Sequence, residues 1–177
     1  MTTAILATIA DLAALPGKAE LIEGELIPTS PASNDHGAIE MAIGAILHAF
    51  VRQQRLGRVF PGDTGFIIAE HTALCPDVAF VSRERLAGTD GKGFVAAVPE
   101  LVVDVVSPSD VWSAVMAKAQ RWLSAGAEQV WIADPETRTV QVIARVGISG
   151  HYRCGERIAG PPALAAFASD VAEFFAD

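Results

Sequence analysis

In the stretch PELVVDVVSPS, residues 99–109, the run from Glu100 to Val106 is almost continuously aliphatic and β-branched. Such a run predicts a strand that is covered on both faces, because a strand with one face in water alternates apolar and polar residues. Ser107-Pro108 ends the run. We therefore expect an α/β fold built around this strand.

The segments that follow indicate one helix and two further strands. Ser109 or Asp110 can cap a helix over about 111–124, and Gly126 suits the position just after its end. A strand over 129–133 breaks at Asp134-Pro135 and pairs across a turn with residues 139–144. The order strand, helix, strand implies a parallel crossover flanked by antiparallel hairpins, hence a mixed sheet.

The preceding half of the chain begins with a short helix near Thr8 and a hairpin over 18–29 that turns at Glu23-Gly24. A helix over about 36–54 follows, with Ser33, Asn34 and Asp35 available as caps. Strands are predicted at 58–60, 65–69 and 77–82, then a glycine-containing loop, and near the other end a turn at 171–175. No repeat or linker divides the chain, so we expect a single domain over 1–177.

Composition narrows the classes of protein that this chain can be. With 177 residues, 51% of them hydrophobic, it can bury a core without disulfides, and Cys75 and Cys154 form no CxxC pair. No signal peptide or long apolar span is evident, so we expect reduced thiols in a cytoplasmic protein outside the membrane. The net charge of −8 is the wrong sign for a broad phosphate-binding surface. Carboxylates that hold a metal ion can account for part of that charge.

Two aspartates stand in apolar strands. Asp104 is the single charged residue of LVVDVV, and Asp77 follows a proline at the entry to another apolar strand, CPDVAFV. A buried, unpaired carboxylate costs several kcal/mol, so Asp104 must be paired, hydrogen-bonded, protonated or bound to a cation. Each aspartate taken alone can equally be a structural carboxylate with satisfied hydrogen bonds.

Lys118 is the third charge in an apolar setting. Residues 111, 115, 118 and 122 share one helix face, so Lys118 has Val111, Val115 and Trp122 as neighbours on that face. From there its ammonium can reach the carboxyl end of the Asp104 strand; the alternative is a lysine that extends to solvent. Glu20 and His36 are weaker candidates that can also be ordinary solvated residues.

Convergent carboxylates with a lysine suit a hard, oxygen-seeking cation such as Mg²⁺, or Mn²⁺ in its place. Such an ion can activate water while the lysine stabilises developing negative charge. Metal-assisted hydrolysis of a phosphodiester is therefore the favoured chemistry.

An ordered set of motifs resembles the Uma-type restriction endonuclease family, which is abundant in cyanobacteria and other bacteria and lies within the PD-(D/E)XK nuclease superfamily. The set comprises ELIEGEL at 20–26, His36, PDVAFV at 76–81, PELVVDVVSPS at 99–109, Lys118 and AEQVWIADP at 127–135. The resemblance implies a restriction-endonuclease-like fold, with a central mixed β-sheet flanked by helices and carrying antiparallel hairpins.

The resemblance also implies roles for individual residues. Asp77 would be the first metal carboxylate and Asp104 the second, with the backbone carbonyl of Val105 as a further ligand. Lys118 would supply the catalytic lysine from the following helix, because Val106 stands where the superfamily pattern has lysine. The remaining implied site residues are Glu20, as an early acidic residue, and His36, as a histidine near the pocket.

Three features depart from the family pattern: Asp104 replaces the usual glutamate, Trp122 the usual tyrosine, and residues 110–118 are more apolar. The leading hypothesis is a Mg²⁺-dependent endonuclease that hydrolyses DNA, as a homodimer. One alternative is a binding or assembly protein that keeps the nuclease fold without catalysis. Another is a metal-dependent hydrolase of smaller phosphate esters.

Overall fold

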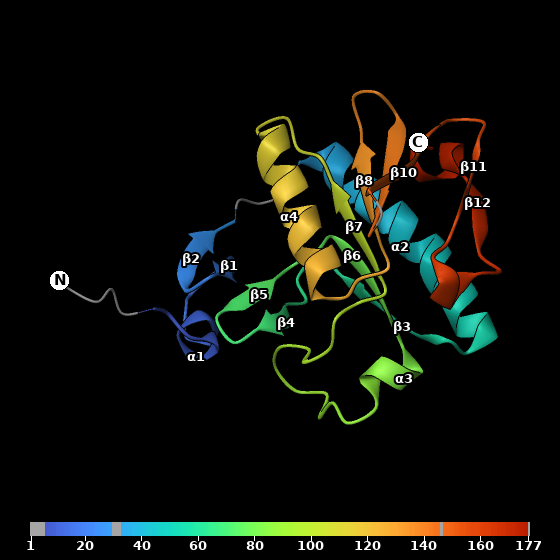
Figure 1. Cartoon of the computed structure of the whole chain (residues 1–177). Coiled ribbons are helices and arrows are strands. Elements are labelled where there is room, and N and C mark those ends of the chain that lie inside the picture. The colour runs from blue at the N-terminus through green and yellow to red at the C-terminus, as the bar shows by residue number, and fades with distance from the viewer. Residues whose placement is uncertain (1–5, 30–32, 146, 177) are drawn as a thin grey trace.

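A computed structural model describes residues 6–29, 33–145 and 147–176. Its centre is a six-stranded mixed sheet in the order β10-β9-β8-β7-β6-β3 (Figure 1). Strands β7 and β8 run parallel and every other neighbouring pair is antiparallel. The strands are β3 (Gly57–Pro61), β6 (Val78–Ser82), β7 (Leu101–Val105), β8 (Gln129–Asp134), β9 (Thr139–Ala144) and β10 (Gly147–Arg153).

Two helices cover the two faces of this sheet (Figure 1). Helix α2 (Asn34–Gln54) packs through Ile43 and Leu47 in one core cluster, which holds the odd-numbered side chains of β7. Helix α4 (Trp112–Ala125) packs in the other cluster, which contains Val102. The predicted double burial of β7 is confirmed, because Leu101, Val102 and Val103 are fully buried.

Smaller elements extend the central sheet. A four-stranded sheet in the order β2-β1-β5-β4 lies on the side of α1 (Ile9–Ala13), and β11 pairs with β12. These strands are β1 (Ala19–Ile22), β2 (Glu25–Pro28), β4 (Phe66–Ala69), β5 (Thr72–Leu74), β11 (Arg157–Ala159) and β12 (Ala168–Asp170). The short helices are α3 (Arg83–Leu86), η1 (Pro162–Leu164) and η2 (Val171–Phe174).

The turn and helix-capping residues predicted from the sequence occupy those positions in the structure. The turn between β1 and β2 places Glu23 and Gly24 at φ 52° and 85°, a left-handed conformation that glycine tolerates best. The Ser33 hydroxyl accepts the His36 N–H at the start of α2. Helix α4 ends at Gly126, with φ 123°.

One expectation about the α4 helix was wrong. Val111 was predicted to lie on its buried face, but Val111 only caps the helix in an extended conformation and is 64% exposed. Helical periodicity cannot apply to a residue that stands just before the helix. Residues 115 and 122 do face the core, Trp122 being fully buried.

Both cysteines are free thiols, Cys154 at the surface and Cys75 partly buried. Among the described residues, no helix combines the length and apolar character needed to cross a membrane.

Candidate metal and catalytic site

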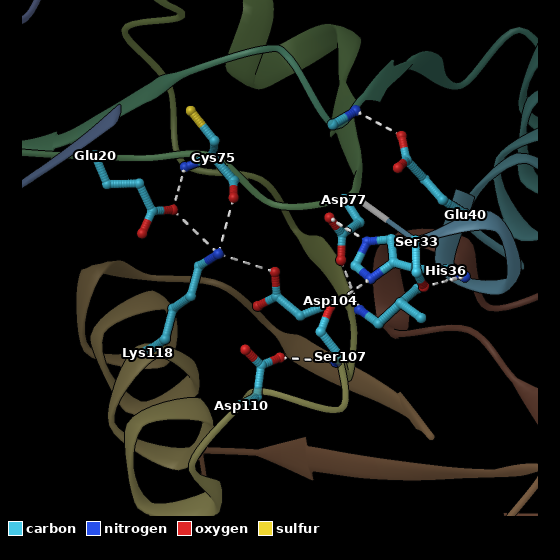
Figure 2. A network of polar contacts seen from close by, with 12 residues as sticks. Glu20, Ser33, His36, Glu40, Cys75, Asp77, Asp104, Ser107, Asp110 and Lys118 are labelled. Carbon is cyan, nitrogen blue, oxygen red and sulfur yellow. Dashed lines mark hydrogen bonds and ion pairs between the residues drawn. The ribbon is translucent and has the colours of Figure 1, made fainter. Parts of the chain in front are cut away.

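Two aspartates meet at one edge of the central sheet. Val78 of β6 pairs with Val103 of β7 in antiparallel register, so Asp77, one residue earlier, lies opposite Asp104. The Asp77 N–H donates to the Val103 carbonyl at 3.0 Å, which holds the two strand ends together. Figure 2 shows the two carboxyl groups on neighbouring strands of the same site.

Asp104 is joined to Lys118 from the helix above it. Because side chains alternate along β7, Asp104 points to the same face as Val102, the face that α4 covers. The Lys118 Nζ lies 3.1 Å from the Asp104 Oδ1, and Figure 2 shows the lysine extending from α4 toward it. The predicted reach of this lysine back to the strand is present in the structure.

Glu20 lies at the same lysine, although it belongs to the smaller sheet. The Lys118 Nζ is 3.1 Å from the Glu20 Oε1 and donates to the Cys75 carbonyl at 2.8 Å. The same Glu20 oxygen accepts the Cys75 N–H at 2.8 Å, so the buried carboxylate is held in place by the backbone after β5. One ammonium is therefore shared by two carboxylates and a carbonyl.

His36 lies beside the other aspartate. Its Nε2 is 3.1 Å from the Asp77 Oδ1, and its Nδ1 is 3.1 Å from the Ser107 Oγ. The Ser107 N–H in turn donates to Asp110 at 2.8 Å, which fixes the turn after β7. The histidine thus connects the first turn of α2 to both strand ends.

The second Asp77 oxygen accepts the Val105 N–H at 2.6 Å. The residue predicted as a backbone ligand therefore lies in the site. Its observed contact is made by the amide; a role for the Val105 carbonyl in binding metal stays a prediction.

The charges of the site shift its pKa values in opposite directions. Burial raises the pKa of Asp104 to about 6, and the nearby Asp77 and Glu20 add to this, against the attraction of Lys118. For Asp77, burial is outweighed by hydrogen bonds from His36 and from the Val105 N–H, so its pKa is lowered.

The two basic groups bind their protons more firmly than usual. The hydrogen bond to Asp77 raises the pKa of His36 despite its burial. Burial alone would lower the pKa of Lys118, but Asp104, Glu20 and Asp77 together raise it.

Comparison with known proteins assigns the chain to a family. The family model described as "Uma2: Putative restriction endonuclease" matches residues 9–172. The chain belongs to the Uma2 family. The predicted resemblance is therefore confirmed, and the family assignment supports a nuclease function.

The fold of this Uma2 protein matches that of a solved structure. A chain described as a putative nuclease belonging to DUF820, from Anabaena variabilis ATCC 29413, superimposes with a TM-score of 0.83. The two are 19% identical, and the match covers 95% of this chain and 97% of the other. The predicted nuclease-type α/β fold is thereby confirmed. No curated protein matches the chain significantly.

Sequence reasoning missed Glu40, which the Uma2 fold brings to the site. One donor atom from each of His36, Glu40 and Asp77 lies within 4.8 Å of the others. Glu40 stands one helical turn after His36, a spacing that puts both on one side of α2, and this was the available signal. The Glu40 Oε1 accepts the Gly62 N–H at 3.1 Å.

The donor set of this Uma2 protein fits a divalent cation. The His36 ring and the carboxylates of Glu40 and Asp77 lie close enough together to hold one ion, and they are hard or borderline ligands of the kind that Mg²⁺ and Mn²⁺ accept. Asp104, on the neighbouring strand, is not part of this group. Burial is the main cause of the raised pKa of Asp104, and the excess negative charge of the nearby Asp77 and Glu20 adds to it. An added cation would relieve that excess.

Proposed function

We propose that this Uma2 protein is a divalent-metal-dependent endonuclease that hydrolyses phosphodiester bonds of DNA. The observation that carries the proposal is the pairing of Asp77 and Asp104 on adjacent strand ends with the Lys118 ammonium 3.1 Å from Asp104. Two carboxylates that can hold a metal ion, with a fixed ammonium beside one of them, suit metal-assisted hydrolysis of a phosphodiester.

Asp77, Asp104 and the Val105 carbonyl are the proposed ligands for Mg²⁺ or Mn²⁺, with Glu40 as an additional carboxylate. When bound, the ion supplies an activated water and a positive charge for the phosphate oxygens. Without a cation the charge of these carboxylates repels a phosphate, so binding of the phosphate at this edge would depend on the ion.

Lys118 serves this reaction as a cation and not as a proton acceptor. Its pKa is raised, so the ammonium stays protonated throughout the physiological range. The contacts with Glu20 and the Cys75 carbonyl fix its Nζ. A fixed positive charge near the phosphate stabilises negative charge that develops in the transition state.

His36 positions Asp77. With Nε2 at Asp77 and Nδ1 at Ser107, the ring is held from both sides, and the Val105 N–H holds the second Asp77 oxygen. A carboxylate with a lowered pKa stays ionised, which a metal ligand must be. His36 is therefore a positioning residue in this proposal.

We infer that the protein acts as a homodimer in the cytoplasm. Cutting both strands of a duplex is naturally achieved by two copies related by two-fold symmetry. Sedimentation equilibrium gives the state directly, and a monomer at all concentrations would exclude paired cutting within one dimer.

The proposal is tested by nicking of supercoiled plasmid with Mg²⁺ or Mn²⁺, beside an EDTA control and an Asp104→Ala variant. We expect metal-dependent nicking that the variant loses. Equal nicking by the variant, or none by the wild type, would overturn the proposal. Circular dichroism of the variant separates loss of chemistry from loss of fold.

A second candidate is hydrolysis of a smaller phosphate ester. The net charge of −8 favours it, because a small ester does not need a broad basic surface. Metal-dependent turnover of bis(p-nitrophenyl) phosphate without plasmid nicking would select this candidate. A folded protein that binds no metal would favour a binding role without catalysis.

A further inference from the structure

The segment that joins the Asp104 strand to the Lys118 helix leaves one tryptophan in an unusual position. Trp112 begins α4 and is 48% exposed, whereas Trp122 and Trp131 are fully buried. Since the chain contains three tryptophans, Trp112 is the one that solvent reaches.

Trp112 continues the face of α4 that packs against the sheet. Steps of four, three and four residues lead back from Leu123 through Ala119 and Met116 to Trp112, so all four lie on one side of the helix. Leu123 and Ala119 are buried and Met116 is packed against the same core cluster. Trp112 therefore lies on the same side of α4 as these core residues, but its side chain is partly exposed to solvent.

The turn before Trp112 is held firmly to the site. Asp110 accepts the Ser107 N–H at 2.8 Å and donates its own N–H to the Ser107 carbonyl at 2.9 Å. The Ser107 Oγ lies 3.1 Å from the His36 Nδ1. Along the chain, Trp112 stands five residues after Ser107, which contacts His36, and six residues before Lys118.

The charge of the protein limits how it can hold nucleic acid. The chain has 13 Lys and Arg against 21 Asp and Glu, so attraction to phosphates over a broad surface is weak. Stacking of a base on an aromatic ring needs no basic surface and contributes at single-stranded or unstacked positions. An exposed indole on the segment between Ser107 and Lys118 can supply this kind of contact.

The start of α4 also suits the phosphate of the same nucleotide. Val111 caps the helix without a side-chain hydrogen bond, so the N–H groups of its first turn are not capped by a side chain. Such a helix start favours an anion, which complements an aromatic platform for a nucleotide more than one for an apolar protein partner.

From these observations we propose that Trp112 stacks on a nucleobase of the substrate, next to the bond that is cut. The proposal rests on the nuclease function proposed above and names the part of the substrate that the site recognises beyond its phosphate. An unpaired or easily unstacked base is the expected partner, because a base within a regular duplex has both faces covered.

The test is binding of a labelled single-stranded oligodeoxynucleotide, followed by fluorescence anisotropy in Ca²⁺ so that binding is measured without requiring cleavage. Trp112→Ala should weaken binding about ten-fold, whereas Trp112→Phe keeps an aromatic ring and should lose much less. Ile148→Ala is the matched control, because Ile148 is an exposed apolar residue on the far edge strand β10.

Two further readouts make the result specific. The emission of Trp112 in the wild type should be quenched by the oligonucleotide, and the remaining emission of Trp112→Phe should not. The loss caused by Trp112→Ala should persist in high salt, because stacking is screened less than phosphate contacts.

Equal binding by wild type and Trp112→Ala would overturn the proposal. If Trp112→Ala weakens binding of an abasic oligonucleotide of the same length by the same factor, the proposal is also overturned. A Trp112 emission that changes with protein concentration alone would overturn it too, because that change indicates a second copy of the protein on this surface. These binding measurements do not need cleavage. The test of base stacking and the plasmid-nicking test of the nuclease function can therefore give opposite results, and failure of one proposal is distinguishable from failure of the other.

Discussion

The Lys118 Nζ lies 3.1 Å from the Asp104 Oδ1, and this contact joins helix α4 to strand β7 of the central sheet. The same ammonium contacts Glu20, so one lysine compensates two carboxylates that come from separate sheets. Lys118 therefore contributes to the stability of the fold as well as to the proposed chemistry.

Replacing Lys118 with Met should destabilise the protein by about 3 kcal/mol, because breaking a buried ion pair leaves uncompensated charge. Plasmid nicking should fall by at least about 100-fold, as for loss of one transition-state charge contact. Urea unfolding and nicking assays measure the two effects. Lys92→Met, at an exposed lysine, is the control and should change neither. A Lys118→Met variant with wild-type activity would remove this residue from the mechanism.

In EDTA the protein should lose stability as the pH rises from about 4 to about 8. The pKa of Asp104 is raised from 3.8 to about 6, so its protonated form is favoured by folding and that contribution disappears as the pH passes 6. The raised pKa of His36 acts in the same direction, its contribution being lost as the pH rises through the folded-state pKa. Asp77, with a lowered pKa, loses its contribution only when the pH falls below 3.8, outside this window.

Between pH 4 and pH 8 the Asp104 part of this effect is about 2 to 3 kcal/mol, because the pKa is shifted by about two units and most of that shift lies within this window. Urea unfolding at the two pH values measures it. Asp104→Asn removes the titrating group, so the variant should show a smaller dependence on pH. Stability that increases with pH in the wild type, or an unchanged slope in the variant, would contradict the assignment.

Glu40→Gln should weaken binding of Mn²⁺ about ten-fold or more, because one anionic donor beside His36 and Asp77 becomes neutral. Glutamine keeps an oxygen that can accept the Gly62 N–H, so the fold should be retained. Isothermal titration with Mn²⁺ gives the affinity, and Glu70→Gln at the surface is the control. An unchanged affinity would show that Glu40 holds the Gly62 loop without contacting metal.

Trp122→Phe should cost less stability than Trp131→Phe, although both tryptophans are fully buried. Within the described ranges the Trp122 Nε1 has no hydrogen-bond partner, whereas the Trp131 Nε1 donates to Gln129 at 3.0 Å. Removing an unpaired buried donor recovers about 1–3 kcal/mol, which offsets the cavity left by the smaller ring. Thermal unfolding of both variants compares them, and equal losses would mean that the Trp122 indole is satisfied in solution.

The sequence by itself determined the central strand, the helices on either side of it and the two aspartates. These are local signals: a strand buried on both faces needs a continuous apolar run, and a charge within such a run stands out because burying it is costly. The position of Lys118 on its helix also followed from periodicity alone. Motif order then predicted the family, which the match over 9–172 confirmed.

Only the tertiary structure decided which side chains share the site and where the core ends. Glu20 and Lys118 are almost 100 residues apart, and their contact depends on how the two sheets pack, which no local pattern records. Glu40 stood on a long amphipathic helix among other polar residues, and its role depends on the Gly62 loop that folds against it. Periodicity predicted which face of α4 packs against the sheet but not how far along the helix that packing extends. Trp112 lies on this face and is still 48% exposed.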